Sequence, residues 1–436
     1  SRMEQSCPPG LHFNVRELTC DWPEKAECIV EKSLDNLSNI TDVEETKPIA
    51  SHNIDSGYKV ICYFTNWAWH RNGQGKYLPE HIDSQYCTHI VYAFANLDYV
   101  NLIIKPQDQW TDIDNEFYIK VTEMKKDGVK VLLGLGGWND SADDKYSRLV
   151  VNQKARSRFI EHLIEFLKKF DFDGVDLNWE YPKCWQVNCN KGPDTDKDGF
   201  SDLIMELNAA LKPQGLLLSA AVSPSKAIID EAYDVPILSK YLDWISIMTY
   251  DYHGYWDNKT GHVAPLYQHE GDIYPHFNTN FSVTYWLEQG AESRKLVLGL
   301  PFYGQSFTLA DTTTTGLNAP ITGPGKAGRF TESAGFLAYY EICELVSSEH
   351  WTVEQIQDGT MGPIAHRQDQ WVSFDDVKDV RRKTDFIKEL NLGGGSIWAL
   401  DLDDFDNLCG CGKYPLLRTV HAELRTPNGS MTHNCV

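Results

Sequence analysis

The segment Phe172–Pro182, FDGVDLNWEYP, constrains the fold more than any other part of the chain. Its central residues alternate between hydrophobic and polar, which is the period of a β-strand, so Asp176, Asn178 and Glu180 share one face. Taken alone, the pattern also fits an edge strand with its polar face in solvent. However, residues 154–170 before it have hydrophobic side chains at helical spacing. A helix followed by a strand favours a covered parallel sheet, with this polar face turned into a closed interior.

Seven more segments read as strands, with helical patterns between them. The eight strands are expected over residues 58–64, 87–94, 129–139, 175–181, 216–223, 244–251, 295–303 and 395–401, with helices over 116–127 and 200–212 among others. Eight strand–helix units predict an α/β fold, a (β/α)8 TIM barrel. In such barrels the active site lies at the carboxyl ends of the strands, which is where Glu180 is expected.

The remaining chain predicts several units besides the barrel. Excess chain between the last two strands is too long for one loop and helix, and predicts a small α+β insertion domain. The segment before the barrel is polar and acidic, which is the composition of a linker. The expected units are a small disulfide module at 1–28, a linker at 29–56, the barrel at 57–303 and 374–420, the insertion at 304–373 and a tail at 421–436.

Charge and composition narrow the classes of partner. The net charge of -22 argues against nucleic acid and anionic membrane surfaces, and favours a neutral polymer or a small molecule. No apolar run reaches the roughly 18 residues of a membrane span. The opening residues, Ser1-Arg-Met-Glu, resemble a cut fragment, so we expect the chain to be part of a larger protein.

Eleven cysteines indicate an extracellular, disulfide-bonded protein. No Cys-x-x-Cys pair is present and the histidine spacing does not suggest zinc, so no metal site is predicted. Sequons occur at Asn36, Asn39, Asn258, Asn280 and Asn428, which is consistent with a secreted glycoprotein. Asn139 also lies in a sequon, but in a predicted active-site loop, where a glycan is not expected.

The same segment resembles a known signature. D-G-x-D-x-D-x-E is typical of family 18 glycoside hydrolases, the chitinases, and this chain matches it at Asp173, Gly174, Asp176 and Glu180 but has Asn178 at the middle Asp. The resemblance covers residues from about 58 to about 419, and the chain is most similar to arthropod multi-domain chitinases. Residues 1–28, with Cys7, Cys20 and Cys28, resemble the second half of a peritrophin-type chitin-binding domain. The resemblance implies chitin or chito-oligosaccharides as the ligand and no cofactor.

The resemblance also implies a mechanism. The N-acetyl group of the substrate acts as the nucleophile, and Glu180 protonates the leaving oxygen. Asp176 supplies the negative charge that raises the pKa of Glu180, while Tyr250 and Asp251 orient the acetamido group. Asn178 can still accept a hydrogen bond from the acetamido N–H and donate one to a neighbouring carboxyl group, but it carries no charge.

Three functions therefore compete. A slow chitinase is favoured because the acid, Glu180, is present, and a neutral hydrogen bond at Asn178 is weaker than a charge-assisted one. A chitin-binding, lectin-like domain with little turnover is the second possibility. A structural domain that positions its neighbours is the third, and the groove tryptophans argue against it. An engineered Asp→Asn exchange would also account for Asn178.

The expected substrate contacts are mainly aromatic. A single Trp is more often part of a core, but several at the carboxyl ends of barrel strands favour sugar binding. By resemblance, Trp398 forms the floor, Trp138 and Trp67 flank it, Trp256 lies on the leaving-group side, Tyr63 and Tyr303 lie near the catalytic subsite, and Met248 and Asn139 complete the set. Gln305 stands where the family often has Arg.

The disulfide pairs are sketched from the family pattern and the order of the cysteines. The expected pairs are Cys7–Cys20, Cys62–Cys87, Cys184–Cys189, then Cys343 with Cys409 or Cys411 and the other of these with Cys435, which leaves Cys28 unpaired.

Overall fold

A computed structural model describes residues 12–14, 19–21, 57–426 and 435. The chain divides into two units, Ser1–His52 and Asn53–Val436. In the first unit, β1 (His12–Asn14) pairs antiparallel with β2 (Thr19–Asp21). The expected linker, the Cys7–Cys20 pair and the unpaired Cys28 lie outside the described residues.

The second unit contains a closed parallel barrel, which confirms the predicted fold. Its eight strands are β3 (Lys59–Thr65), β4 (His89–Leu97), β6 (Lys130–Gly136), β7 (Gly174–Asn178), β8 (Leu217–Val222), β9 (Trp244–Ile247), β10 (Leu296–Pro301) and β17 (Gly394–Trp398). Neighbours in this order are hydrogen-bonded in parallel, and β17 pairs with β3 to close the ring. β5 (Ile104–Pro106) adds an antiparallel strand to the end of β4.

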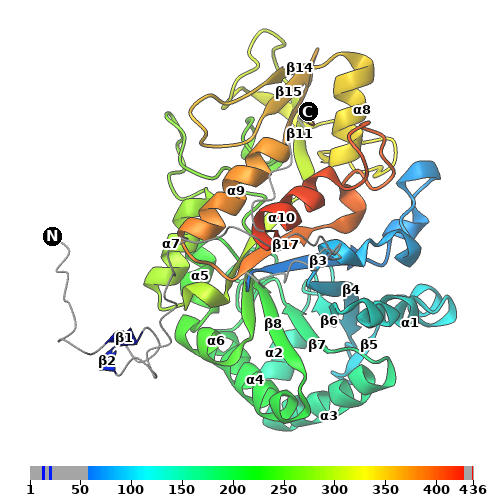
Figure 1. The fold of residues 1–436 in the computed structure, drawn as a ribbon, viewed down its shortest axis with the longest axis vertical. Helices are drawn as coiled ribbons and strands as arrows, with labels where there is room; N and C mark the ends of the chain where they lie inside the picture. Colours follow the sequence, from blue (N-terminus) through cyan, green and yellow to red (C-terminus); the bar gives the residue numbers. More distant parts are fainter. Residues whose placement is uncertain (1–11, 15–18, 22–56, 427–434, 436) are drawn as a thin grey trace, which may run out of the picture. The chain divides into compact units, whose positions relative to one another are not determined.

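Helices cover the outside of the barrel (Figure 1). They are α1 (Phe117–Thr122), α2 (Lys145–Val150), α3 (Gln153–Lys169), α4 (Thr195–Leu211), α5 (Lys226–Ala232), α6 (Val235–Tyr241), α7 (Thr279–Glu288), α9 (Val377–Glu389) and α10 (Pro415–Arg425). α3 shows how the sequence directs them: the Asn152 side chain caps its first turn by accepting from the backbone N–H groups of Lys154 and Ala155. Its hydrophobic face, including Phe159 and Leu163, is buried.

An antiparallel sheet and a helix lie between the last two barrel strands, as predicted. The elements of this insertion are β11 (Tyr303–Leu309), β12 (Ile321–Pro324), β13 (Phe336–Ala338), α8 (Tyr339–Glu349), β14 (Thr352–Glu354), β15 (Ile364–Arg367) and β16 (Gln370–Ser373). β11 begins directly after β10, so the insertion grows from the carboxyl end of the barrel, where Figure 1 shows β11, β14, β15 and α8 grouped together. Phe307 and Trp371 pack in a small core of its own.

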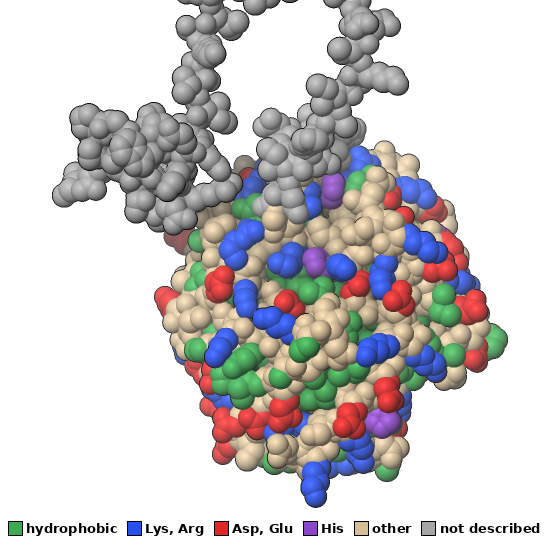
Figure 2. Space-filling model, turned by 60° about the horizontal axis from the view of Figure 1, so that its bottom comes forward, with side chains coloured by type: hydrophobic (Ala, Val, Ile, Leu, Met, Phe, Trp, Pro, Cys, Tyr) green, Lys and Arg blue, Asp and Glu red, His purple; other side chains and the backbone are tan. Residues whose placement is uncertain are grey.

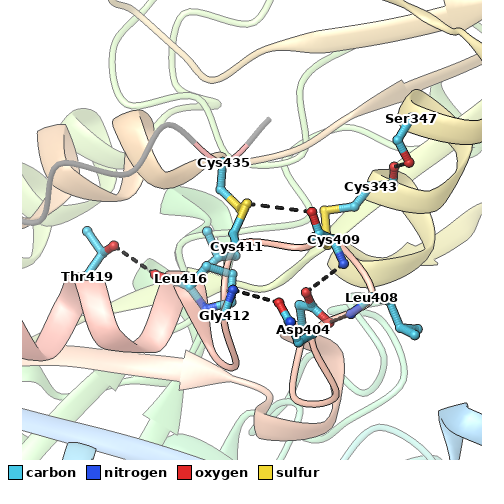
Figure 3. The surroundings of a disulfide bond; sticks show 12 residues. Cys343, Ser347, Asp404, Leu408, Cys409, Cys411, Gly412, Leu416, Thr419 and Cys435 are labelled. Carbon is cyan, nitrogen blue, oxygen red and sulfur yellow. Dashed lines mark hydrogen bonds between the residues drawn. A yellow bond between two sulfur atoms is a disulfide. The ribbon is translucent and has the colours of Figure 1, made fainter.

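Four disulfides lie within the second unit: Cys62–Cys87, Cys184–Cys189, Cys343–Cys409 and Cys411–Cys435. They confirm two expected pairs and decide the choice left open at Cys343. Figure 3 shows that Cys343 on α8 is joined to the loop after β17, and that Cys435 is joined to the same loop. Within the loop, the Asp404 carboxylate accepts from the backbone N–H groups of Leu408 and Cys409, at 2.7 and 2.8 Å.

Three further observations concern the surface, the helices and the end of the chain. Figure 2 shows acidic and basic side chains interspersed over the face that it presents. No helix among the residues described is both long and apolar enough to span a membrane. α10 extends to Arg425, so the polar tail that we expected from residue 421 begins inside a helix.

Candidate active site

The polar face of β7 points into the closed barrel interior, as its sequence predicts. Asp176 is fully buried, and Asn178 is 3% exposed. The Asp176 carboxylate accepts hydrogen bonds from Ser219 Oγ at 2.6 Å and from the Tyr63 hydroxyl at 2.9 Å. Burial raises the pKa of Asp176 to about 6, although both hydrogen bonds act in the opposite direction. Asp176 is therefore a buried carboxyl group of the barrel interior that two hydrogen bonds hold in place.

Glu180 follows the end of β7, where the strand reaches the cleft. Its backbone N–H donates to Ser141 Oγ at 2.9 Å, which fixes the chain just after the strand. Burial raises the pKa of Glu180 to about 8, and the negative charge of Asp251 adds to the rise. We expected this charge from Asp176, and the structure assigns it to Asp251 instead. With this pKa, the carboxyl group holds its proton at neutral pH.

A double-glycine turn after β6 brings a loop over this strand. Gly136 and Gly137 have φ values of +116° and +91°, a region that favours glycine. The N–H of Gly137 donates to the carbonyl oxygen of Asn178 at 2.8 Å, and a Cβ at Gly136 would lie 2.3 Å from that same oxygen. Glycine is thus required for the close approach, and the loop then carries Trp138 and Asn139 into the cleft.

Residues after β9 form the opposite side of the site. The Asp251 carboxylate accepts from Gln305 Nε2 at 2.7 Å and from the Tyr303 side chain. Gln305, which replaces the Arg often found in the family, therefore holds Asp251 without neutralising it. Asp251 is exposed to the cleft, yet the protein around its carboxyl group removes water from it, and this desolvation raises its pKa. Tyr250 contacts the Tyr303 ring edge-on, with centroids 6.0 Å apart.

The cleft at this end of the barrel has a volume of about 590 Å³. It is lined by Trp67, Phe94, Asn96, Gln107, Gly136, Gly137, Trp138, Asn139, Asp140, Asn178, Glu180, Met248, Tyr250, Asp251, Tyr303 and Trp398. Its floor is aromatic: the Trp398 ring stacks on Phe94 at 5.8 Å and lies 6.2 Å from Trp67. No cluster of three His, Cys, Asp or Glu side chains in the described part of the chain is arranged to hold a metal ion.

Most of the predicted site residues meet in this cleft, and three do not line it. Tyr63 and Asp176 lie beneath it as a hydrogen-bonded pair. Trp256 is 51% exposed on the short 3₁₀ helix Tyr255–Asp257, outside the cleft lining. Sequence reasoning missed Phe94 and Asn96, although both lie near the carboxyl end of a predicted strand, the position that directs side chains into the site.

The comparisons with known proteins agree with this geometry. Residues 59–403 match the model of glycosyl hydrolases family 18. The chain belongs to this family. Residues 1–28 match the chitin-binding peritrophin-A domain.

Individual family 18 relatives include insect chitinases and a human pseudo-chitinase. The chain is 52% identical to probable chitinase 10 of Drosophila melanogaster over 99% of its own length, but spans only 20% of that protein. Catalytic domain 2 of the Ostrinia furnacalis group II chitinase superposes with a TM-score of 0.86 at 56% identity, covering 87% of this chain and 99% of that domain. Human YKL-39 is described as a pseudo-chitinase with retained chitooligosaccharide binding. It superposes with a TM-score of 0.77 at 38% identity, covering 84% of this chain and 99% of the YKL-39 chain.

Proposed function

We propose that this chain hydrolyses chitin, the β-1,4-linked polymer of N-acetylglucosamine, with Glu180 as the general acid. The observation that carries the proposal is the raised pKa of Glu180, about 8, at the end of a barrel strand inside an aromatic cleft. A general acid must hold its proton at working pH until the transition state, and an ordinary surface Glu does not. Similarity to insect chitinases supports the same reaction.

The proposed mechanism is retaining and substrate-assisted. The carbonyl oxygen of the substrate's N-acetyl group attacks the anomeric carbon while Glu180 gives its proton to the leaving oxygen. Water then opens the oxazolinium ion, and the Glu180 carboxylate takes a proton back from that water. Tyr250 and Asp251 orient the acetamido group, and the aromatic floor at Trp398 supports the distorted sugar. One protein acid is enough, because the substrate supplies the nucleophile.

Asn178 sets the rate in this proposal. Its Oδ1 atom is buried and has no hydrogen-bond partner within residues 57–426 and 435. Asn178 lines the cleft, so a turn of its side chain would offer this unused acceptor to an acetamido N–H. A neutral acceptor stabilises the positive oxazolinium less than a carboxylate does. Loss of one such preorganised contact slows comparable sites by about 100- to 1000-fold. We therefore propose a slow chitinase.

A lectin-like function is the second candidate, and the Asn178 exchange is the observation that favours it. The exchange removes a charge from the site and leaves the cleft and its tryptophans in place. YKL-39 has the same fold and is described as binding chito-oligosaccharides without being a chitinase. On this reading the cleft holds the polymer and does not cleave it.

Hydrolysis of a chitin hexasaccharide distinguishes the two candidates. Product anomers are followed by NMR for this chain and for Glu180→Gln, which keeps the shape of the acid and removes its proton. Slow release of β-anomers by the parent chain, with loss of turnover in Glu180→Gln, supports the proposed chitinase. Binding of the hexasaccharide without turnover of the parent favours the lectin, and α-anomers contradict the retaining mechanism.

The remaining features concern the setting of the domain. We propose an extracellular location, because four disulfides are formed in the second unit and such bonds persist in oxidising compartments. We also propose that the domain works within a larger chitin-binding protein, which the peritrophin-A match and the length of the Drosophila relative support.

A further inference from the structure

A second groove adjoins the catalytic cleft, with a volume of about 480 Å³. The two share Trp67 and Trp398, so the second groove, here named the outer groove, continues the cleft away from Glu180. One of its walls runs from Thr65, the last residue of β3, to Asn72, and the other is the insertion-domain loop 330–336. Arg71 lies in the first wall, where its side chain forms an ion pair with Asp401 at 2.7 Å.

The two walls of the outer groove are in direct contact. Asn72 Nδ2 donates to Glu332 Oε1 at 3.0 Å, between residues that are 260 positions apart in the chain. Below this bond, Gly75 lies against Phe330 so closely that a Cβ there would be 2.4 Å from the Phe330 Cβ. The walls are therefore packed at their base and joined by a hydrogen bond at the surface, where Asn72 and Glu332 are both exposed.

The insertion-domain wall is held in place from behind. Glu341, on α8, is 3% exposed, and its carboxylate accepts from the backbone N–H groups of Phe330 at 2.7 Å and Thr331 at 2.9 Å. The Thr331 hydroxyl donates to the same carboxylate at 2.8 Å. Cys343, two residues further along α8, is tied to the barrel through Cys409. The loop that presents Glu332 is therefore fixed relative to the barrel.

We propose that the Asn72–Glu332 hydrogen bond closes the outer groove and determines the length of chito-oligosaccharide that the site binds. This inference rests on the proposed function, because it assigns the outer groove to the same polymer. A short oligomer fits between Glu180 and the bond, whereas a longer one must break it. The hydrogen bond then reduces the affinity for long oligomers and leaves that for short ones unchanged.

Affinity as a function of oligomer length tests this inference. Titrations with N-acetylglucosamine oligomers from the trimer to the hexamer are made in the Glu180→Gln background, which prevents turnover. In Asn72→Asp, two carboxylates face each other and the bond is lost. In Asn72→Asp with Glu332→Gln, the amide and the carboxylate exchange places and the bond can form again. Arg329→Ala is the matched control for a general disturbance of this wall, since the Arg329 side chain pairs with Glu344 and covers the Phe330 ring but takes no part in the Asn72–Glu332 bond.

The hexamer-to-trimer affinity ratio should rise by about two- to fivefold in Asn72→Asp, the range expected for one exposed hydrogen bond. It should return to the parent ratio in the double variant and stay at that ratio in Arg329→Ala. An unchanged ratio in Asn72→Asp, or the same rise in the double variant, overturns the inference. If the parent binds no oligomer of any length, the proposed function itself fails and the inference falls with it.

Discussion

Replacing Glu180 with Gln should stabilise the protein at alkaline pH relative to the parent chain. Glu180 has a pKa of about 8 when folded, against an ordinary value of 4.5. Between these two pH values the unfolded chain is ionised at this residue and the folded chain is protonated. The parent's free energy of unfolding therefore falls as pH rises through this window and levels off above about pH 8. Gln has no such titration, so the difference between the two proteins isolates Glu180.

The size of the effect follows from the shift. The rise of the Glu180 pKa from 4.5 to about 8 corresponds to a free energy of about 5 kcal/mol, at 1.36 kcal/mol for each pKa unit. Glu180 faces an open cleft, where water screens its charge, so we expect about 2 kcal/mol between pH 5 and pH 9. Urea unfolding of the parent and of Glu180→Gln across this range measures it, with Glu161→Gln on the exposed face of α3 as the control. A difference that stays constant with pH would show that Glu180 ionises as an ordinary carboxyl group and would refute the reasoning.

Three more predictions follow from the site and its supports. The kcat/KM for hexasaccharide hydrolysis should fall as pH rises past about 8, where Glu180 loses its proton, and a profile that stays flat well above this value would contradict the assignment. Trp398→Ala should weaken hexasaccharide binding by about tenfold or more. A thermal melt of the variant checks that it is folded, and unchanged affinity would show that Trp398 does not contact the sugar. Replacing Cys343 and Cys409 with Ser removes a disulfide that joins residues 66 positions apart, and should lower the free energy of unfolding by about 4 kcal/mol. An unchanged urea midpoint would show that this disulfide does not stabilise the fold.

The barrel was predictable because its signals are local. Each strand is a short hydrophobic run, and the alternation around Asp176 and Glu180 indicates which face turns inward. The family pattern added the acid and several tryptophans, which the structure gathers in one cleft. These features depend on residues that are neighbours in the chain.

Contacts between distant segments could not be read in this way. Phe94 and Asn96 line the cleft because β4 is part of the closed barrel, and no local sequence pattern separates them from core residues. The sequence suggests Asp176, four residues away, as the charge next to Glu180, but this charge comes from Asp251, which the segment after β9 brings to the cleft. The Asn72–Glu332 bond joins a barrel loop to the insertion domain, and no local pattern marks either residue.

The central claim, that a protonated Glu180 acid works beside a weakened partner, is tested most directly by restoring the missing carboxylate. Initial rates of chitin hexasaccharide hydrolysis are compared for the parent chain, Asn178→Asp and Glu180→Gln at one pH. The account predicts slow turnover by the parent, a rate about 100- to 1000-fold higher in Asn178→Asp and none in Glu180→Gln. Equal rates for the parent and Asn178→Asp would contradict it, and binding without turnover in both would assign the chain to the lectin-like function.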